Sequence, residues 1–169
     1  ILKEAARTLN YLTENNLLQY ADLERKFEDV HSSYDRTGKE LKGVEARLRE
    51  VQPLIKNISN YQRLKPVYDA FQKAKDKPGF KARHEAELVI FEAARSTLLA
   101  MQGDEKLPSL KTLQAEQAQL FEEQKRLYAE RNRVKKEAKQ IETIKSNVDT
   151  FLAPSAEHDR DHLRSTQRE

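Results

Sequence analysis

Apolar residues in the first third of the chain recur in alternating steps of four and three. The residues between them are mostly Glu, Lys, Arg and Asp, and only Thr37 interrupts the run. A sustained period of 3.5 residues is typical of a left-handed coiled coil. Pro53 lies inside the run, so the pattern predicts one long helix with a kink there. The predicted seam consists of Leu23, Phe27, Val30, Tyr34, Leu41, Val44, Leu48, Val51, Ile55 and Ile58.

A second long helix is predicted after residues 107–109, with Ser109 as a candidate N-cap. Phe121, Tyr128 and Ile144 are expected to widen its apolar stripe. Since the two runs are of similar length, pairing Leu23 with Val148 aligns them as one antiparallel hairpin. The second seam has one residue every seven positions: Leu113, Leu120, Leu127, Val134, Ile141 and Val148.

The segment between the two runs lacks the heptad pattern, and its proline-containing stretches and apolar run predict a small helical head. A short helix is expected to start at Lys65-Pro66-Val67-Tyr68, and Lys77-Pro78-Gly79 is expected to form a turn. The next helix, from Phe80 to Met101, is apolar nearly all round, which predicts burial on several sides.

The predicted fold class is all-α: a long antiparallel coiled-coil hairpin with a helical head at its tip and a short N-terminal helix at its base. Leu2, Ala5, Leu9 and Leu12 share one face of that short helix, and Glu14-Asn15-Asn16 is expected to form a turn. This face is expected to pack beside Val148, Phe151 and Leu152. The expected segments are a base helix (1–16), a first arm (17–62), a head (63–108), a second arm (109–152) and a disordered tail (153–169).

Composition supports an elongated helical protein. Apolar residues make up 37% and charged residues 35%, with four glycines and five prolines, too few for the turns of a β-protein. The absence of cysteine excludes disulfide scaffolds and thiolate zinc sites. No apolar run is long enough for a membrane span, so a cytoplasmic location is expected. The first residue is Ile1, so we expect a piece of a longer protein.

Residues that could carry chemistry are sparse. His158 and His162 have a spacing that suits a metal ligand pair, but we interpret them as chance residues of a polar tail. His84 begins a zinc-protease-like pattern without its second histidine, and is expected to pack at the head surface against Glu87 or a tyrosine. We expect no catalytic residues, no cofactor and no metal in this chain. The candidate nucleophiles Tyr61, Tyr68 and Tyr128 are interpreted as structural.

Net charge is only +3, from 31 basic and 28 acidic residues, but residues 124–146 carry eight basic and three acidic side chains. This basic stripe suits either a phosphate backbone or a protein partner. Without interleaved aromatics for base stacking, we favour partial neutralisation by Asp35, Glu40 and Glu45 on the facing arm. The candidate nucleic-acid or partner contacts are Lys125, Arg126, Arg131, Arg133, Lys135, Lys136 and Lys139.

From about Leu9 to Leu152 the chain resembles the C-terminal helical region of bacterial relaxases, the mobilisation nucleases of plasmids and integrative conjugative elements. The similar stretches are residues 65–70 (KPVYDA), 84–94 (HEAELVIFEAA), 107–111 (LPSLK) and 127–130 (LYAE). The resemblance implies a parent protein that nicks DNA at a transfer origin with an N-terminal tyrosine and a histidine-bound metal. Neither feature lies in this chain.

Two functions therefore compete at the level of sequence. In the first, the chain is a non-catalytic scaffold or docking module that contacts the relaxosome, the transfer coupling protein or another copy of itself. In the second, it is a nucleic-acid-binding hairpin that uses the basic stripe, like the arm of a seryl-tRNA synthetase. A coiled-coil spacer without a partner is a third alternative. Heptad seams serve intramolecular and intermolecular pairing equally well, so a homodimer stays open.

Overall fold

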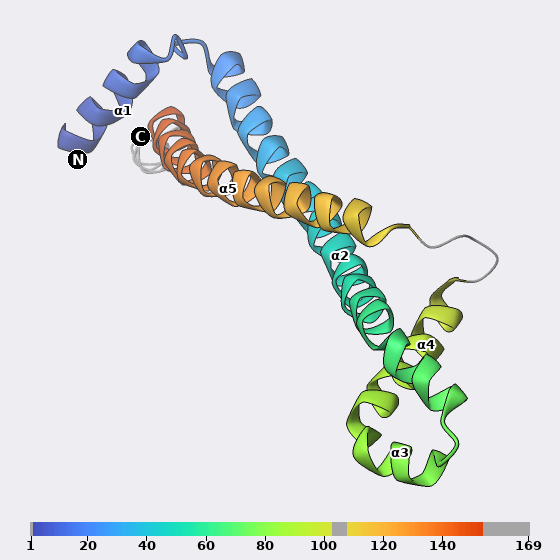
Figure 1. Ribbon diagram of the computed structural model, residues 1–169. Helices are drawn as coiled ribbons and strands as arrows, with labels where there is room; N and C mark the ends of the chain where they lie inside the picture. Colours follow the sequence, from blue (N-terminus) through green and yellow to red (C-terminus); the bar gives the residue numbers. More distant parts are fainter. Residues whose placement is uncertain (1, 103–107, 154–169) are drawn as a thin grey trace, which may run out of the picture. The chain divides into compact units, whose positions relative to one another are not determined.

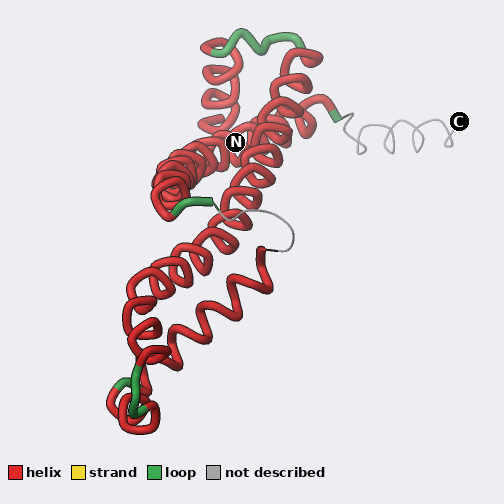
Figure 2. Tube along the Cα trace, turned by 45° about the vertical axis from the view of Figure 1, so that its right-hand side comes forward, coloured by secondary structure: helices red, strands yellow, loops and turns green. Residues whose placement is uncertain are grey.

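The computed structural model describes residues 2–102 and 108–153, and these residues form five helices (Figure 1). They are α1 (Leu2–Glu14), α2 (Tyr20–Lys73), α3 (Lys77–Arg83), α4 (Glu85–Gln102) and α5 (Leu110–Leu152). Within these ranges there is no strand, and loops join the helices (Figure 2). The predicted all-α class is confirmed.

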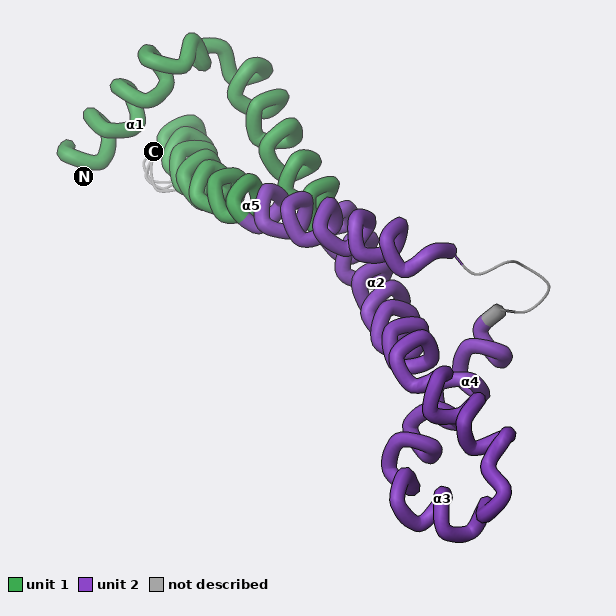
Figure 3. Tube along the Cα trace, in the orientation of Figure 1, with its two compact units in different colours: residues 1–38, 129–169 green, residues 39–128 purple. Residues whose placement is uncertain are grey.

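The chain divides into two compact units (Figure 3). Unit 1 consists of residues 1–38 and 129–169, and unit 2 consists of residues 39–128. Both long helices contribute to both units: α2 and α5 each supply one segment to unit 1 and another to unit 2.

In unit 1, apolar side chains of α2 and α5 meet in one core, and α1 adds to it. The hydroxyl of Tyr20 donates a hydrogen bond to Asp149, whereas Tyr34, further along α2, lies against Arg131, earlier in α5. The two helices therefore run in opposite directions within this unit. The buried core residues are Leu17, Leu23, Val30, Val134, Ala138, Ile141 and Ile144.

Unit 2 has a separate core, formed by α2, α4 and α5. Arg47 of α2 donates from Nε and Nη2 to the two carboxylate oxygens of Glu116 of α5, at 2.6 and 3.1 Å. Glu45, two residues earlier in α2, accepts a hydrogen bond from the hydroxyl of Tyr128, later in α5, at 2.6 Å. The order of partners is again opposite in the two helices. The buried core residues are Val51, Ile58, Leu98 and Leu113.

Every residue of the two predicted seams is buried or half-buried. Thr37, which interrupts the first seam, is buried too, and its hydroxyl lies 2.9 Å from the carbonyl oxygen of Tyr34. A hydrogen-bonded threonine is tolerated inside a core because its polar group keeps a partner. Ile144 is buried as expected, but Phe121 and Tyr128 are exposed, so the second seam is narrower than predicted.

The boundary expected between the first arm and the head does not interrupt the helix. α2 continues through both Pro53 and Pro66 to Lys73, so the separate short helix predicted from Lys65 was wrong. A proline inside a helix removes one backbone hydrogen bond. Burial of Ile58 and Leu64 between the two prolines favours continuation of the helix.

The head also differs at the predicted turn. Lys77-Pro78-Gly79 forms the first turn of α3, because the Asp76 carboxylate caps this helix by accepting a hydrogen bond from the Gly79 backbone N–H at 3.0 Å. Proline is favoured at such a position, where no helical N–H is needed. The helix predicted from Phe80 to Met101 is divided at His84 into α3 and α4.

Two further helix termini follow their local signals. Ser109 caps α5 as predicted, because its Oγ accepts a hydrogen bond from the backbone N–H of Thr112 at 3.1 Å. Asn16 has a left-handed backbone with φ of 55° in the turn after α1, a conformation that asparagine tolerates.

The face by which α1 packs differs from the prediction. Leu2 and Leu9 are exposed, whereas Thr8 is 3% exposed and accepts a hydrogen bond from Asn147 of α5 at 3.1 Å. Phe151 is exposed as well. Leu12 of the predicted face and the expected partner Val148 do pack on the core of unit 1, together with Tyr11. The expectation therefore holds for the C-terminal part of α1 and for Val148, and the polar pair of Thr8 and Asn147 adds to this contact.

Candidate functional site

The clearest candidate surface lies on α4. Four residues of this helix, Leu88, Phe91, Ala94 and Leu98, are buried against the core of unit 2. The opposite side is solvent-exposed, which corrects the expectation that this helix is buried on several sides. Residues spaced by three and four share a helix face. The uncharged residues of the outward side of α4 are Ala86, Val89, Ile90, Ala93, Ser96, Ala100 and Met101, with the half-buried Thr97 at one edge and the exposed Glu85 and Glu92 at the other.

Several of the uncharged side chains on the outward face of α4 are large. Val89 is 60% exposed, Ile90 41% and Met101 44%. Leu99, at the edge of this face, is 62% exposed. Single exposed apolar residues are ordinary, but a contiguous apolar helix face is a feature of interaction surfaces.

Aromatic stacking fixes the orientation of α4 within unit 2. The ring of Phe91 stacks on Tyr61 and on Tyr68 of α2, with centroid separations of 5.1 and 4.5 Å. Arg95 donates a hydrogen bond to the Tyr68 hydroxyl at 3.3 Å. Because this side of α4 is held by α2, its other side faces outward. The structural interpretation of Tyr61 and Tyr68 agrees with these contacts.

A hollow of about 370 Å³ adjoins the outward face where α3 and α4 meet the end of α2. Aromatic and aliphatic side chains form much of its wall. The charged residues Lys81, Glu85 and Glu92 form the rest. His84 lies beside it in sequence and its Nδ1 is 2.5 Å from the Glu87 carboxylate, as predicted. The apolar lining residues are Tyr68, Phe71, Leu88 and Val89.

A second candidate surface is a basic face of α5 in unit 1. Its members are exposed: Lys135, Lys136 and Lys139 lie opposite the core-facing residues of the helix, and Arg133 lies at the side, in the wall of a hollow that also contains Lys26 and Asp29 of α2. Glu137, at the side of the helix, accepts from Lys26 of α2 at 2.6 Å and lies 3.6 Å from Arg133. In the part of the chain that the structure describes, the three lysines form no ion pair.

The other residues of the predicted basic stripe do not belong to this face. Lys125 and Arg126 lie in unit 2, and Arg126 is paired with Glu123 at 2.6 Å. Arg131 is half-buried, with its guanidinium over the ring of Tyr34.

Two of the acidic residues expected to neutralise the stripe do not form an ion pair with it in the described parts of the chain. Glu45 accepts a hydrogen bond from a tyrosine hydroxyl in unit 2, and Asp35 forms no ion pair among the described residues. Glu137, on α5 itself, lies 3.6 Å from Arg133 of the basic face.

A polar cluster of unit 1 links the start of α2 to the end of α5. Lys145 donates to the Asp149 carboxylate at 2.8 Å and to the Tyr20 hydroxyl at 3.1 Å. The hydrogen bond to Asp149 raises the pKa of Lys145, and the same bond lowers the pKa of Asp149. A lysine held protonated in this way is a poor nucleophile or base at neutral pH, so the cluster fits a structural role. It borders an open hollow of about 670 Å³ with Phe27 in its wall.

Within residues 2–102 and 108–153, His, Asp and Glu side chains do not gather in a group of three that could hold a metal ion. The predicted tail, with His158 and His162, lies outside the described residues apart from Ala153. None of the described helices has an apolar stretch that would cross a bilayer. No family model, curated protein or solved structure matches the chain.

Sequence reasoning missed the outward face of α4 because it weighed only the total apolar content of the helix. The signal was the distribution of side-chain size. Large residues such as Phe91 and Leu98 share the buried side, while alanine recurs every seven residues on the other side, at 86, 93 and 100.

Proposed function

We propose that this chain is a non-catalytic helical docking module that makes protein–protein contacts through the outward face of α4. The observation that carries the proposal is the exposed apolar surface around Val89 and Ile90, bordered by Glu85 and Glu92, on a helix whose opposite side is anchored in the core of unit 2. The cores of protein interfaces are depleted in charge and enriched in apolar side chains. A rigid helix face also meets a partner at a small entropic cost.

In this proposal the long helices α2 and α5 act as the scaffold that carries the docking surface. We infer that α2 and α5 are the arms of one antiparallel coiled-coil hairpin, with the head and the short N-terminal helix at its two ends. Support comes from the seven-residue spacing of both seams and from the opposite order of partners within each unit.

The resemblance to relaxases supplies the parent protein and the partner class. The chain is then the C-terminal module of a conjugative relaxase in the bacterial cytoplasm, and its partners are relaxosome components or the transfer coupling protein. The parent's DNA-nicking tyrosine and metal would lie in a domain outside this chain.

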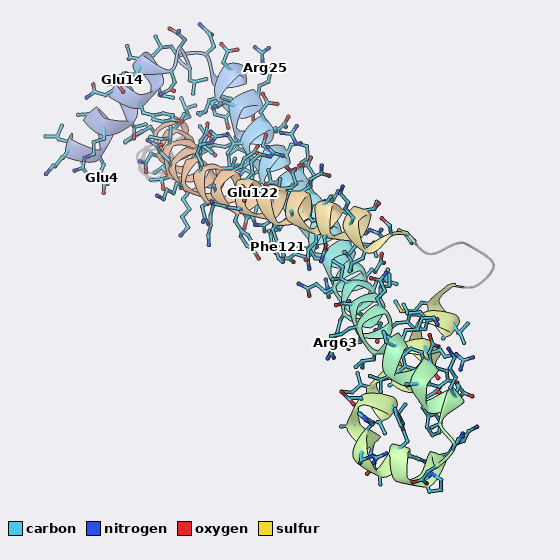
Figure 4. The ribbon with its side chains drawn as sticks, in the orientation of Figure 1. Glu4, Glu14, Arg25, Arg63, Phe121 and Glu122 are labelled. Atoms are coloured by element: carbon cyan, nitrogen blue, oxygen red, sulfur yellow. The ribbon has the colours of Figure 1, made fainter. Side chains whose placement is uncertain are left out.

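Capture of purified relaxosome and coupling proteins by the immobilised chain tests this function. We expect Val89→Glu to reduce capture at least tenfold, because it places a charge at the centre of the apolar face. Phe121→Glu is the matched control, since Phe121 is a 44%-exposed apolar residue on α5 of the same unit (Figure 4). No capture by the wild-type chain, or equal capture by both variants, would overturn the proposal.

The basic face of α5 favours a second candidate function, binding of a nucleic-acid backbone. Arg133, Lys135, Lys136 and Lys139 are exposed, and the lysines have no ion-pair partner in the described parts of the chain. Each phosphate contact adds about 0.7–0.9 to the slope of log affinity against log salt.

Titration with single-stranded and duplex DNA at two salt concentrations tests this second function. Charge reversal of the four residues of the basic face should abolish a steep salt dependence. Reversal of four exposed lysines elsewhere is the control: Lys39, Lys42, Lys56 and Lys111. If both sets reduce binding equally, the basic face is not a specific site. If neither DNA nor proteins bind, the spacer alternative is favoured.

A further inference from the structure

We infer that the outward face of α4 takes an amphipathic helix of a partner protein, with basic residues along one edge of that helix. This inference rests on the proposed docking function and names the chemistry of the partner at the same surface. Two features support it: the heptad spacing of the face and the sign of the charges at its edge.

The spacing of the outward face matches the requirements of a partner helix. Ala86, Val89, Ala93, Ser96 and Ala100 follow one another in steps of three, four, three and four. This is the period with which one helix packs along another in a coiled coil. The same helix thus carries two apolar sides, and α2 covers only the side with Phe91 and Leu98.

A large anchor residue of the partner has a place beside this seam. The hollow of about 370 Å³ opens next to Val89, with Tyr68 and Phe71 in its wall. Helices that bind in grooves characteristically insert apolar side chains at such spacings. A leucine or phenylalanine from the partner fits the aromatic and aliphatic lining.

The charges along the edge of this face determine the preferred partner. Glu85 and Glu92, seven residues apart, border the apolar positions on one side. Glu85 is exposed and forms no ion pair within the described residues. Glu92 lies 3.9 Å from Arg95, and Arg95 also donates a hydrogen bond to the Tyr68 hydroxyl.

The opposite edge of the face carries no charge, because Ile90, Thr97 and Met101 occupy it. Among the residues that the structure describes, Lys81 is the one cation in the wall of the hollow, and it would repel a basic partner. Lysines or arginines of the partner beside Glu85 and Glu92 would complement the edge, whereas an acidic partner would be repelled. Such pairs contribute mainly to specificity and to the rate of association.

Two synthetic helical peptides provide the test. Both have the same leucine and alanine seam, and they differ only in lysines or glutamates along the edge that would face Glu85 and Glu92. By fluorescence anisotropy at low salt, we expect the lysine-edged peptide to bind the full chain about tenfold more tightly than the glutamate-edged one. Glu85→Lys combined with Glu92→Lys should reverse this preference, and Lys81→Gln should preserve it.

Val89→Glu and Ile90→Glu should each abolish binding of both peptides, and circular dichroism shows whether these exposed-site variants keep their helices. Equal affinity for the two peptides, no binding of either, or no reversal in the double variant would overturn the inference about charge. If both peptides bind equally and Val89→Glu still blocks capture of transfer proteins, the inference about a basic partner helix fails but the proposed docking function stands. A concentration-dependent dimer that Val89→Glu disperses would assign the face to a second copy and overturn the inference.

Discussion

The guanidinium of Arg131 lies over the ring of Tyr34, with Cζ 4.3 Å from the ring centroid. Its Nη1 occupies the space that a side chain at residue 38 would need, and residue 38 is glycine. Gly38 is buried in the middle of α2. Arg131, a charged residue within the predicted second arm, is thus accommodated in two ways: its guanidinium stacks on the ring of Tyr34, and Gly38 of the facing helix has no Cβ to obstruct it.

This relationship makes Gly38→Ala less favourable than Gly43→Ala. Alanine is favoured over glycine inside a helix by about 1 kcal/mol, and a Cβ at Gly43 meets no atom within 4 Å. We expect Gly43→Ala to raise the free energy of unfolding by about that amount. Gly38→Ala should gain less, because it displaces a stacked guanidinium worth about 0.5–1 kcal/mol. Urea denaturation measures both changes.

The double variant isolates the cause. In an Arg131→Ala background, Gly38→Ala has no guanidinium to displace and should raise the free energy of unfolding by as much as Gly43→Ala does. If Gly38→Ala is as stabilising as Gly43→Ala in the otherwise wild-type chain, the proposed conflict with Arg131 does not exist.

Truncation of a seam residue should be far more costly than truncation of an exposed one. Leu113 has 0% exposure in the core of unit 2, and Leu→Ala at such sites costs about 2–5 kcal/mol. Phe121→Ala, on the exposed side of the same helix, should change stability by no more than about 0.5 kcal/mol. Thermal and urea unfolding report the difference, and similar values for the two variants would contradict the assignment of the core.

The ion pair between Arg47 and Glu116 should make unit 2 sensitive to acid. The hydrogen bond from Arg47 lowers the pKa of Glu116 below its ordinary value of 4.5. A carboxyl group with a lowered folded-state pKa stabilises the fold above its ordinary pKa and loses this contribution as the pH falls through the folded value. Stability should therefore decline below about pH 4.5.

Glu116→Gln should flatten this part of the profile of unfolding free energy against pH. Glu122→Gln is the control, because Glu122 is exposed on the same helix and forms no ion pair within the described residues (Figure 4). Identical profiles for the two variants would show that the Arg47 pair contributes nothing to the acid response.

The contact between Thr8 and Asn147 should control how firmly α1 is held. Thr8→Ala leaves the amide donor of Asn147 without its partner, which costs about 1 kcal/mol or more in a buried setting. We expect faster amide hydrogen exchange across residues 2–14. Thr13→Ala is the matched control, since its hydroxyl bonds only to the Leu9 carbonyl of the same helix, at 2.9 Å. Unchanged exchange in Thr8→Ala would show that the apolar contacts of α1 suffice.

The heptad seams could be predicted from the sequence because a period of 3.5 residues has one structural explanation over many turns. The proline and glycine signals were less decisive. Lys77-Pro78-Gly79 suits a turn or a first helical turn equally, and the carboxylate of Asp76, which caps the helix, decided the outcome. Pro66 does not end α2, because the buried Leu64 before it and the half-buried Val67 and Tyr68 after it outweigh one lost hydrogen bond.

The candidate surfaces were harder to predict because exposure depends on which neighbours are present. The apolar content of α4 indicated burial, yet only one side of the helix has a partner, and Val89 stays in solvent. The sequence shows where basic residues are concentrated, but not which of them are free to bind. Arg131 lies over the ring of Tyr34, and Arg126 pairs with Glu123. Side-chain pairing of this kind requires coordinates.

Site-directed photo-crosslinking tests the docking function most directly. The chain has no cysteine of its own, so a benzophenone probe can be placed at Val89→Cys on α4 or at Lys136→Cys on α5. In a mixture with transfer-origin DNA, relaxosome components and the coupling protein, we expect the probe at residue 89 to form a protein adduct and the probe at residue 136 to form none. Adducts with DNA from residue 136, and no protein adduct from residue 89, would contradict the account.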